Sequence, residues 1–297
     1  MNNSETVDSE ILSERMEAFK QYLVNEEKSD STIEGYMRNI KRFIRYAGDG
    51  KVSKNTVLEY KSRLIKMYKT ATINAALSAI NSFFDFLGYL YLKVKTIKMQ
   101  KEIFYSEDKE LTKTDYEKLL HAAMQKKHKR IYYIMQTIAA TGIRVSELKY
   151  ITTEALNKKY AEVRCKGKNR IVILPDDLCV LLKGYVRENN IKRGSVFVTR
   201  TGRTLDRTAV WREMCDLCKT AGVKKSKVFP HNLRHLFART YYSHEKDIVR
   251  LADILGHSSV NTTRIYTMES GQVHRRQIQM LGLVLKRDKK ITTQLTL

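Results

Sequence analysis

Three segments in the second half of the chain carry side chains suited to phosphoryl transfer. Arg144 follows a glycine in ATGIRVSEL, Arg234 lies in PHNLRH, and Tyr266 comes near the end of the polar run ILGHSSVNTTRIYT. A guanidinium grips the two non-bridging oxygens of a phosphodiester through paired, charge-assisted hydrogen bonds, and two of them can neutralise a pentacoordinate phosphorane. A tyrosine hydroxyl can attack phosphorus and form a covalent intermediate. These residue types therefore predict phosphoryl transfer through a tyrosine nucleophile.

Proton transfer in such a reaction needs a base and an acid, and nearby residues can supply both. His231 lies three positions before Arg234, which puts both on one face of a helix expected to begin at Pro230. His257 lies on a Leu-Gly-His corner, and Lys166 and Lys168 lie at the expected hairpin tip in CKGKNR. Because arginines would take the place of Mg²⁺, we expect neither a metal nor a cofactor.

Each of these residues also has a structural interpretation when taken alone. A lone arginine is usually solvated, a lone histidine is usually a satisfied polar residue, and a lone tyrosine usually packs in a core. We expect His235 to be a structural hydrogen-bonding residue beside the site. Cys215 and Cys218 form one C-x-x-C without a second pair or nearby histidine, so free thiols are expected there and no zinc site.

The composition points to a polyanionic partner. The chain has 297 residues, enough for two domains, and 55 basic residues against 32 acidic ones leave a formal charge of +23. Nucleic acid explains this better than a membrane surface, because the basic residues do not cluster beside one amphipathic helix. With no apolar run long enough to span a bilayer and a polar, acidic N-terminus, we expect a cytoplasmic protein.

The sequence predicts a mainly α fold with a small β-sheet, since only two prolines and 13 glycines interrupt it. We expect a helical domain at 9–92, a charged linker at 93–110, a second domain at 111–285 and a tail at 286–297.

The first domain should contain four helices. The second of these should open with a capping box from Ser31 to Glu34 and stop at Gly48. Its polar face is basic and should contact DNA, through Arg38, Lys41, Arg42 and Arg45.

The second domain should open with another capping box, Thr112 to Asp115. The alternating runs YAEVRCKG and NRIVILP should form a hairpin, and SVFVTR at 195–200 a further short strand.

Taken together, ATGIRVSEL, HNLRH and ILGHSSVNTTRIYT resemble the signature boxes of the tyrosine recombinases, the phage-integrase family that includes the Xer type. The resemblance covers nearly the whole chain. It implies an N-terminal helical core-binding domain of the SAM-like type, followed by a tyrosine recombinase catalytic domain.

The resemblance also implies a role for each residue. Arg144 and Arg234 would bind the scissile phosphate, Lys166 would be the general acid toward the leaving 5′-oxygen, and His231 would exchange the proton of the nucleophile. His257 would hydrogen-bond the phosphate, Tyr266 would form the 3′-phosphotyrosyl bond, and Glu147 would brace the site. The hairpin here is one residue shorter than the family pattern G-K-G-x-K-x-R, so the choice between Lys166 and Lys168 as general acid stays open. With Lys166 as the acid, we expect Lys168 to contact DNA.

The implied activity is site-specific recombination of double-stranded DNA through a Holliday junction, carried out by a homo-tetramer. The apolar run in QVHRRQIQMLGLVL either packs on its own domain or, as the family suggests, docks on a neighbouring protomer. Two alternatives remain: strand relaxation of the type IB topoisomerase kind, and a non-catalytic DNA-binding regulator on the same scaffold. The DNA target and the biological role do not follow from the sequence.

Overall fold

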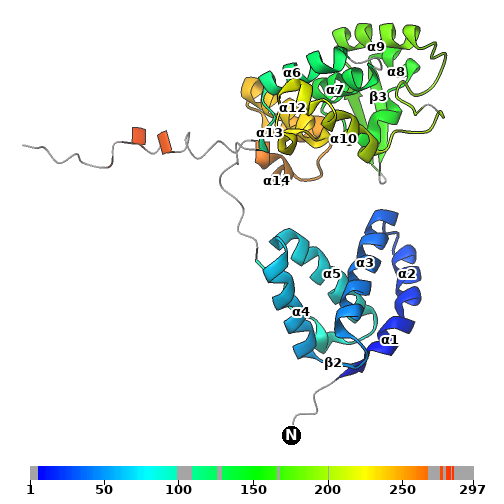
Figure 1. Cartoon of the computed structure of the whole chain (residues 1–297), viewed down its shortest axis with the longest axis vertical. Helices are drawn as coiled ribbons and strands as arrows, with labels where there is room; N and C mark the ends of the chain where they lie inside the picture. Colours follow the sequence, from blue (N-terminus) through cyan, green and yellow to red (C-terminus); the bar gives the residue numbers. More distant parts are fainter. Residues whose placement is uncertain are drawn as a thin grey trace, which may run out of the picture. The chain divides into compact units, whose positions relative to one another are not determined.

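The structure, a computed structural model, divides into two compact units at residues 1–101 and 102–297 (Figure 1). It describes residues 6–98, 109–125, 129–165, 168–199, 201–266, 275–276, 279–281 and 283. Lys166 and the tail expected at 286–297 lie outside the described residues. Both units are mainly helical, and each has a small two-stranded antiparallel sheet, which confirms the predicted fold class. None of the helices within those ranges is long and apolar enough to cross a membrane.

The N-terminal unit is a helical bundle with an aromatic core. The first of the four expected helices forms as two shorter helices. Arg15 separates them and is the N-cap of the second. Phe19, Phe43, Phe83 and Phe84 are completely buried and pack edge to face or tilted against one another. The elements are β1 (Val7–Asp8), α1 (Ser9–Glu14), α2 (Met16–Asn25), α3 (Asp30–Ala47), β2 (Lys51–Val52), α4 (Lys54–Met67), α5 (Thr70–Phe86) and η1 (Leu90–Leu92).

The capping box expected from Ser31 to Glu34 is wrong. Helix α3 begins at Asp30, and its N-cap is Ser29, two residues before the expected cap, so Ser31 already lies inside the helix. The predicted stop at Gly48 is confirmed, because Gly48 is the C-cap with φ +68°.

The segment that follows η1 is held along α5. The side chain of Asn81 exchanges two hydrogen bonds with the backbone of Val94, at 2.8 and 2.9 Å, and Asn74 does the same with Ile97, both at 2.8 Å. Residues 93–98, expected as the beginning of the linker, are therefore fixed to the N-terminal unit.

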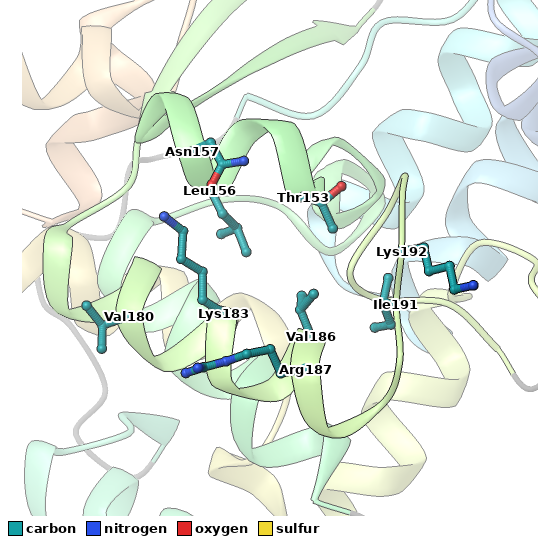
Figure 2. Close-up of a pocket in the computed structure, with 9 residues that line it drawn as sticks. All are labelled: Thr153, Leu156, Asn157, Val180, Lys183, Val186, Arg187, Ile191 and Lys192. Atoms are coloured by element: carbon teal, nitrogen blue, oxygen red, sulfur yellow. The ribbon is translucent and has the colours of Figure 1, made fainter.

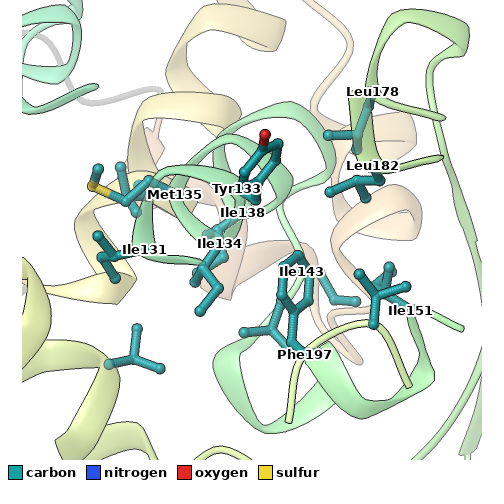
Figure 3. Close-up of a cluster of buried hydrophobic side chains, with 14 of the residues drawn as sticks. Ile131, Tyr133, Ile134, Met135, Ile138, Ile143, Ile151, Leu178, Leu182 and Phe197 are labelled. Carbon is teal, nitrogen blue, oxygen red and sulfur yellow. The ribbon is translucent and has the colours of Figure 1, made fainter. Parts of the chain in front are cut away.

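The C-terminal unit is built around one central helix. Figure 3 shows its core, in which Ile134 and Ile138 of α7 pack with Ile151, Leu182 and Phe197 from other elements. Helix α12 runs along α7. The elements are α6 (Lys113–Met124), α7 (Arg130–Thr141), η3 (Val145–Tyr150), α8 (Thr153–Lys158), β3 (Tyr160–Cys165), β4 (Lys168–Ile173), α9 (Asp176–Glu188), α10 (Arg207–Cys215), α11 (Cys218–Ala221), η4 (Lys225–Lys227), α12 (Pro230–Glu245), α13 (Ile248–Leu255), α14 (Val260–Thr263) and η5 (Arg264–Tyr266).

Several local predictions for this unit are confirmed. Thr112 and Asp115 form the capping box of α6, and α12 begins at Pro230. Strands β3 and β4 pair from Tyr160↔Ile173 to Cys165↔Lys168 as the predicted hairpin.

The strand expected at 195–200 is wrong. Within the described residues 195–199 only isolated bridges form, Thr152↔Ser195 and Val198↔Thr204. Val196 and Phe197 are instead 1% exposed each, so this apolar run fills the core rather than extending the sheet.

Candidate active site

Arg234 is a fully buried charged side chain at the site. It projects from the second turn of α12 and is 1% exposed. Its Nη1 donates to the carbonyl of Gly142, and its Nη2 donates to the carbonyl of Leu255 at 2.7 Å. Gly142 is the C-cap of α7 and Leu255 is the last residue of α13. Because helix C-termini carry partial negative charge, two helix ends together solvate this buried cation.

Two glycines in left-handed conformation make these helix ends possible. Gly142 and Gly256 both have φ +64°, and each ends its helix. A Cβ on Gly142 would lie 2.6 Å from the Phe237 ring, and one on Gly256 would lie 2.4 Å from Cδ of Arg170. Glycine is therefore required at both positions by conformation and by close packing.

Arg144 is tethered by a buried carboxylate. Its Nη1 and its backbone nitrogen donate to the two oxygens of Glu147, each at 2.9 Å. The side chain of Arg144 is 39% exposed, whereas that of Glu147 is 2% exposed. Burial would raise the pKa of Glu147, but the hydrogen bond from the Arg144 backbone and the charge of Arg170 outweigh it and lower that pKa. Glu147 is thus a permanent carboxylate that orients Arg144.

His257 lies between Arg234 and Thr263. Arg234 Nη2 is 3.0 Å from its Nε2, and Thr263 Oγ1 is 2.9 Å from its Nδ1. Since an arginine can only donate, Nε2 accepts, and the protonated Nδ1 donates to Oγ1 of Thr263. Burial, followed by the charges of Arg234 and Arg144, lowers the pKa of His257 to about 4. The ring is neutral at neutral pH.

Tyr266 packs against the same arginine. It is 4% exposed, its ring stacks on His257 with centroids 6.2 Å apart, and it meets the ring of His235 at right angles with centroids 5.0 Å apart. Burial raises the pKa of the phenol, while the charge of Arg234 and a hydrogen bond with it act in the opposite direction. The hydroxyl therefore reaches Arg234 within one chain.

The two histidines of α12 complete the cluster. The rings of His231 and His235 are 4.5 Å apart between centroids, with His231 at the exposed side. Packing of its ring, then the charges of Arg234 and Arg207, lower the pKa of His231. Burial, then the charge of His231, lowers the pKa of His235 to about 3. Both are therefore neutral at neutral pH.

The structure thus brings together Arg144, Glu147, His231, Arg234, His235, His257 and Tyr266. Lys166 lies outside the described residues, and Lys168 contributes backbone pairing at the start of β4. Arg38, Lys41, Arg42 and Arg45 are all exposed on α3 of the other unit, where Arg42 lies over the ring of Tyr68.

Two contributors were missed at the level of sequence, Arg170 and Thr263. Arg170 donates from Nη2 to Glu147 at 2.6 Å and is 13% exposed. The alternation of strand β4 could have located it, because Arg170 lies on the same face as the buried Val172. The hydrogen bond of Thr263 joins two residues six apart across a turn, and no periodic pattern marks it.

Two further features of the unit do not belong to this cluster. A groove of about 540 Å³ lies between α8 and α9 (Figure 2), where Leu156 and Val186 line it together with Lys183. None of the predicted site residues contributes to it. Across the part of the chain that the structure describes, no group of three or more His, Cys, Asp or Glu side chains is placed to hold a metal ion.

Comparison with known proteins agrees with this arrangement. Residues 109–272 match the model of the phage integrase family, and residues 16–88 match the phage integrase N-terminal SAM-like domain. Because the first match covers more than half of the chain, the chain belongs to the phage integrase family.

Named relatives are similar along most of their length. The TnP I resolvase of Bacillus thuringiensis is 29% identical over 273 residues, which cover 84% of this chain and 93% of the relative. Tyrosine recombinase XerD of Halalkalibacterium halodurans is 30% identical over 261 residues, 80% of this chain and 87% of the relative. Among solved structures, a lambda integrase tetramer bound to a Holliday junction superposes with a TM-score of 0.69 at 18% identity, covering 88% of this chain and 78% of that one. This last likeness shows the fold.

The depressed histidine pKa values make the stability of the C-terminal unit depend on pH. His235 and His257 have pKa values of about 3 and 4 in the folded chain, below the ordinary histidine value of about 6.5. The unfolded chain therefore binds more protons below pH 6.5, and stability is lost as the pH falls from there toward the folded pKa values. We expect each histidine to cost roughly 1–2 kcal/mol of unfolding free energy between pH 7 and pH 5.

Trp211, the single tryptophan, lies on α10 of this unit, so its fluorescence in denaturant titrations at the two pH values measures the effect. His235→Gln should remove the part of the pH dependence that His235 contributes. An unfolding free energy that stays constant from pH 7 to pH 5 would contradict the burial of neutral histidines.

Proposed function

We propose that the chain is a site-specific DNA recombinase that cuts and rejoins strands through a 3′-phosphotyrosyl bond on Tyr266. The observation that carries the proposal is the placement of the Tyr266 ring on His257, which accepts from Arg234, a buried cation that forms no ion pair with a carboxylate among the described residues. A nucleophile held beside an uncompensated positive charge suits attack on an anionic phosphodiester.

The charge balance of the cluster favours an anion. In the described part of the chain, Arg144, Arg170 and Arg234 are accompanied by one carboxylate, Glu147. Burial, followed by the like charge of Arg144, lowers the pKa of Arg234 to about 10. Nε of Arg234 is buried and has no hydrogen-bond partner among the described residues. A phosphate oxygen would relieve the repulsion and accept from such a donor.

The reaction proceeds by in-line displacement. The Tyr266 oxygen attacks phosphorus, its proton passes to the neutral His231, and the bond to the 5′-oxygen breaks as that oxygen takes a proton from Lys166. Arg144 and Arg234 hold the non-bridging oxygens, and His257 donates to one of them after its ring proton moves from Nδ1 to Nε2 and the phosphate replaces Nε2 as an acceptor from Arg234. Rejoining is the reverse, with the 5′-hydroxyl of another strand as nucleophile, so the phosphodiester energy is kept in the phosphotyrosine and no nucleotide cofactor is consumed.

Assembly on DNA follows the same proposal. We assign double-stranded DNA with a specific recombination site as the partner and a homo-tetramer as the active form, and the apolar run within residues 273–285 docks on a neighbouring protomer. The relatives named resolvase and tyrosine recombinase support exchange of strands over relaxation of the topoisomerase kind. An enzyme with this substrate works in the cytoplasm.

Tyr266→Phe should abolish the covalent adduct, because the phenyl ring offers no nucleophile. DNA fragments that stay attached to the protein after denaturation in expressing cells supply the target sequence, and a nicked suicide duplex of that sequence is the substrate. The adduct is measured by its resistance to SDS. Tyr241→Phe is the matched control, since Tyr241 packs in the same small cluster and should keep full activity. Adduct formed by Tyr266→Phe, or none formed by the wild-type chain, would contradict the proposal.

A sulfur at the bridging 5′ position should separate Lys166 from Lys168. A thiolate leaves without a proton, so loss of the general acid is rescued by this substitution. We expect Lys166→Ala to cleave ordinary duplex at least about 100-fold more slowly and to regain near wild-type rates with the sulfur substrate. Lys168→Ala should show little difference between the substrates. The reverse pattern would assign the acid to Lys168.

The basic face of α3 should neutralise DNA phosphates. Replacing Arg38, Lys41, Arg42 and Arg45 by glutamine should lower the slope of log K against log salt by roughly one for each phosphate that the variant leaves unneutralised. Fluorescence anisotropy with the target duplex at several salt concentrations measures this slope. Lys20→Gln is the control, because Lys20 is paired with Glu17 on α2. An unchanged slope in the quadruple variant would place the DNA elsewhere.

A further inference from the structure

Arg170 joins three elements of the site. It lies on β4, and its guanidinium donates from Nη2 to Oε2 of Glu147 and from Nη1 to the carbonyl of Ile254, both at 2.6 Å. Glu147 belongs to η3, and Ile254 lies in the last turn of α13. One planar fork therefore spans a carboxylate and a helix end that come from distant parts of the sequence.

The carboxylate that Arg170 holds is the one that holds Arg144. Glu147 Oε1 accepts from Nη1 of Arg144, while Oε2 accepts from the Arg144 backbone and from Arg170. Because Arg144 is 39% exposed at its side chain, this carboxylate provides the contacts that orient it. A displaced Arg170 would let the carboxylate rotate, and Arg144 would follow.

The second contact of Arg170 reaches the residues that hold His257. Ile254 is followed by Leu255, whose carbonyl accepts from Arg234, by Gly256 and then by His257. A Cβ on Gly256 would lie 2.4 Å from Cδ of Arg170, so the backbone at this corner rests directly on the arginine side chain. Arg170 thus supports the backbone that sets the position of His257.

We propose that Arg170 is a positioning residue, which acts through Glu147 and the end of α13 to align Arg144 and His257 on the scissile phosphate. This inference rests on the proposed function. A lysine at this position would keep the charge but would lose the fork, since one ammonium group cannot meet both acceptors with the same planar geometry. Arg170→Lys therefore disturbs the alignment of Arg144 and His257 and leaves the charge at this position unchanged.

The chain contains a matched control for this substitution. Arg130, at the start of α7, also bridges a carboxylate and a backbone carbonyl, those of Glu213 and Val198. It lies at the opposite end of α7 from Gly142, about 18 Å away along the helix axis. Arg130→Lys removes the same kind of contact without touching the site.

The closing experiment compares Arg170→Lys with Arg130→Lys on the nicked suicide duplex at saturating protein. We expect Arg170→Lys to form the adduct roughly 10- to 100-fold more slowly, the range found when supporting contacts of a site are removed, and Arg130→Lys to stay within about twofold of wild type. The bridging-sulfur duplex should not rescue Arg170→Lys, because Arg144 and His257 act on the phosphate and not on the leaving group. Thermal unfolding verifies that both variants are folded.

A second measurement needs no activity. The ring resonance of His257, identified by its loss in His257→Gln, should move in Arg170→Lys and stay in place in Arg130→Lys in protein without DNA. Equal cleavage rates for the two arginine variants, or a His257 resonance that does not move, would overturn the positioning role. A wild-type chain that forms no adduct would instead reject the proposed function, while the resonance would still decide the placement of His257.

Discussion

The burial of the Arg234 guanidinium is the constraint on which the rest of the C-terminal unit depends. Removing a cation from water costs several kcal/mol unless fixed acceptors replace the solvent. The carbonyls of Gly142 and Leu255 are those acceptors, and each becomes free only because its helix ends there. The chain must therefore stop α7 and α13 at positions that face α12, and the two left-handed glycines are the means of stopping them. One buried charge thereby fixes the relative placement of three helices.

The choice of acceptor also explains how the same charge remains available for chemistry. A carboxylate beside Arg234 would solvate it but would cancel its field, whereas carbonyl dipoles solvate it and leave the net charge in place. Arg144, by contrast, is paired with a carboxylate, that of Glu147, which also accepts from Arg170. The result is one rigid, uncompensated cation and one tethered, half-exposed cation. A phosphodiester that enters meets an oriented field before any side chain has moved.

Much of this could be predicted from the sequence, because the relevant signals are local. The glycine in ATGIRVSEL, the proline before HNLRH and the glycine before His257 each mark a helix end or start, and the structure has α7, α12 and α13 ending or beginning there. Alternation predicted the hairpin for the same reason. The error at 195–200 arose because tertiary packing placed Phe197 in the core. At Ser31 the error arose because two nearby serines offered similar local caps and Ser29 took that position. The alternation of β4 could have placed Arg170 on the buried face, but its partners, Glu147 and Ile254, are 23 and 84 residues away, and no local pattern encodes acceptors at that distance.

The state of Tyr266 follows from the same electrostatics and explains why a histidine of low pKa is useful beside it. In the free site the charge and hydrogen bond of Arg234 oppose the effect of burial on the phenol. In the proposed reaction a phosphate accepts from Nε of Arg234, which has no hydrogen-bond partner among the described residues, and offsets the charge of this arginine. The assistance that Arg234 gives to the phenol therefore falls when the substrate arrives. The proton must then go to a separate acceptor, and that acceptor must be unprotonated at neutral pH. Packing and the surrounding arginines hold the pKa of His231 below its ordinary value, so the arginines that attract the phosphate also keep His231 ready to receive the proton.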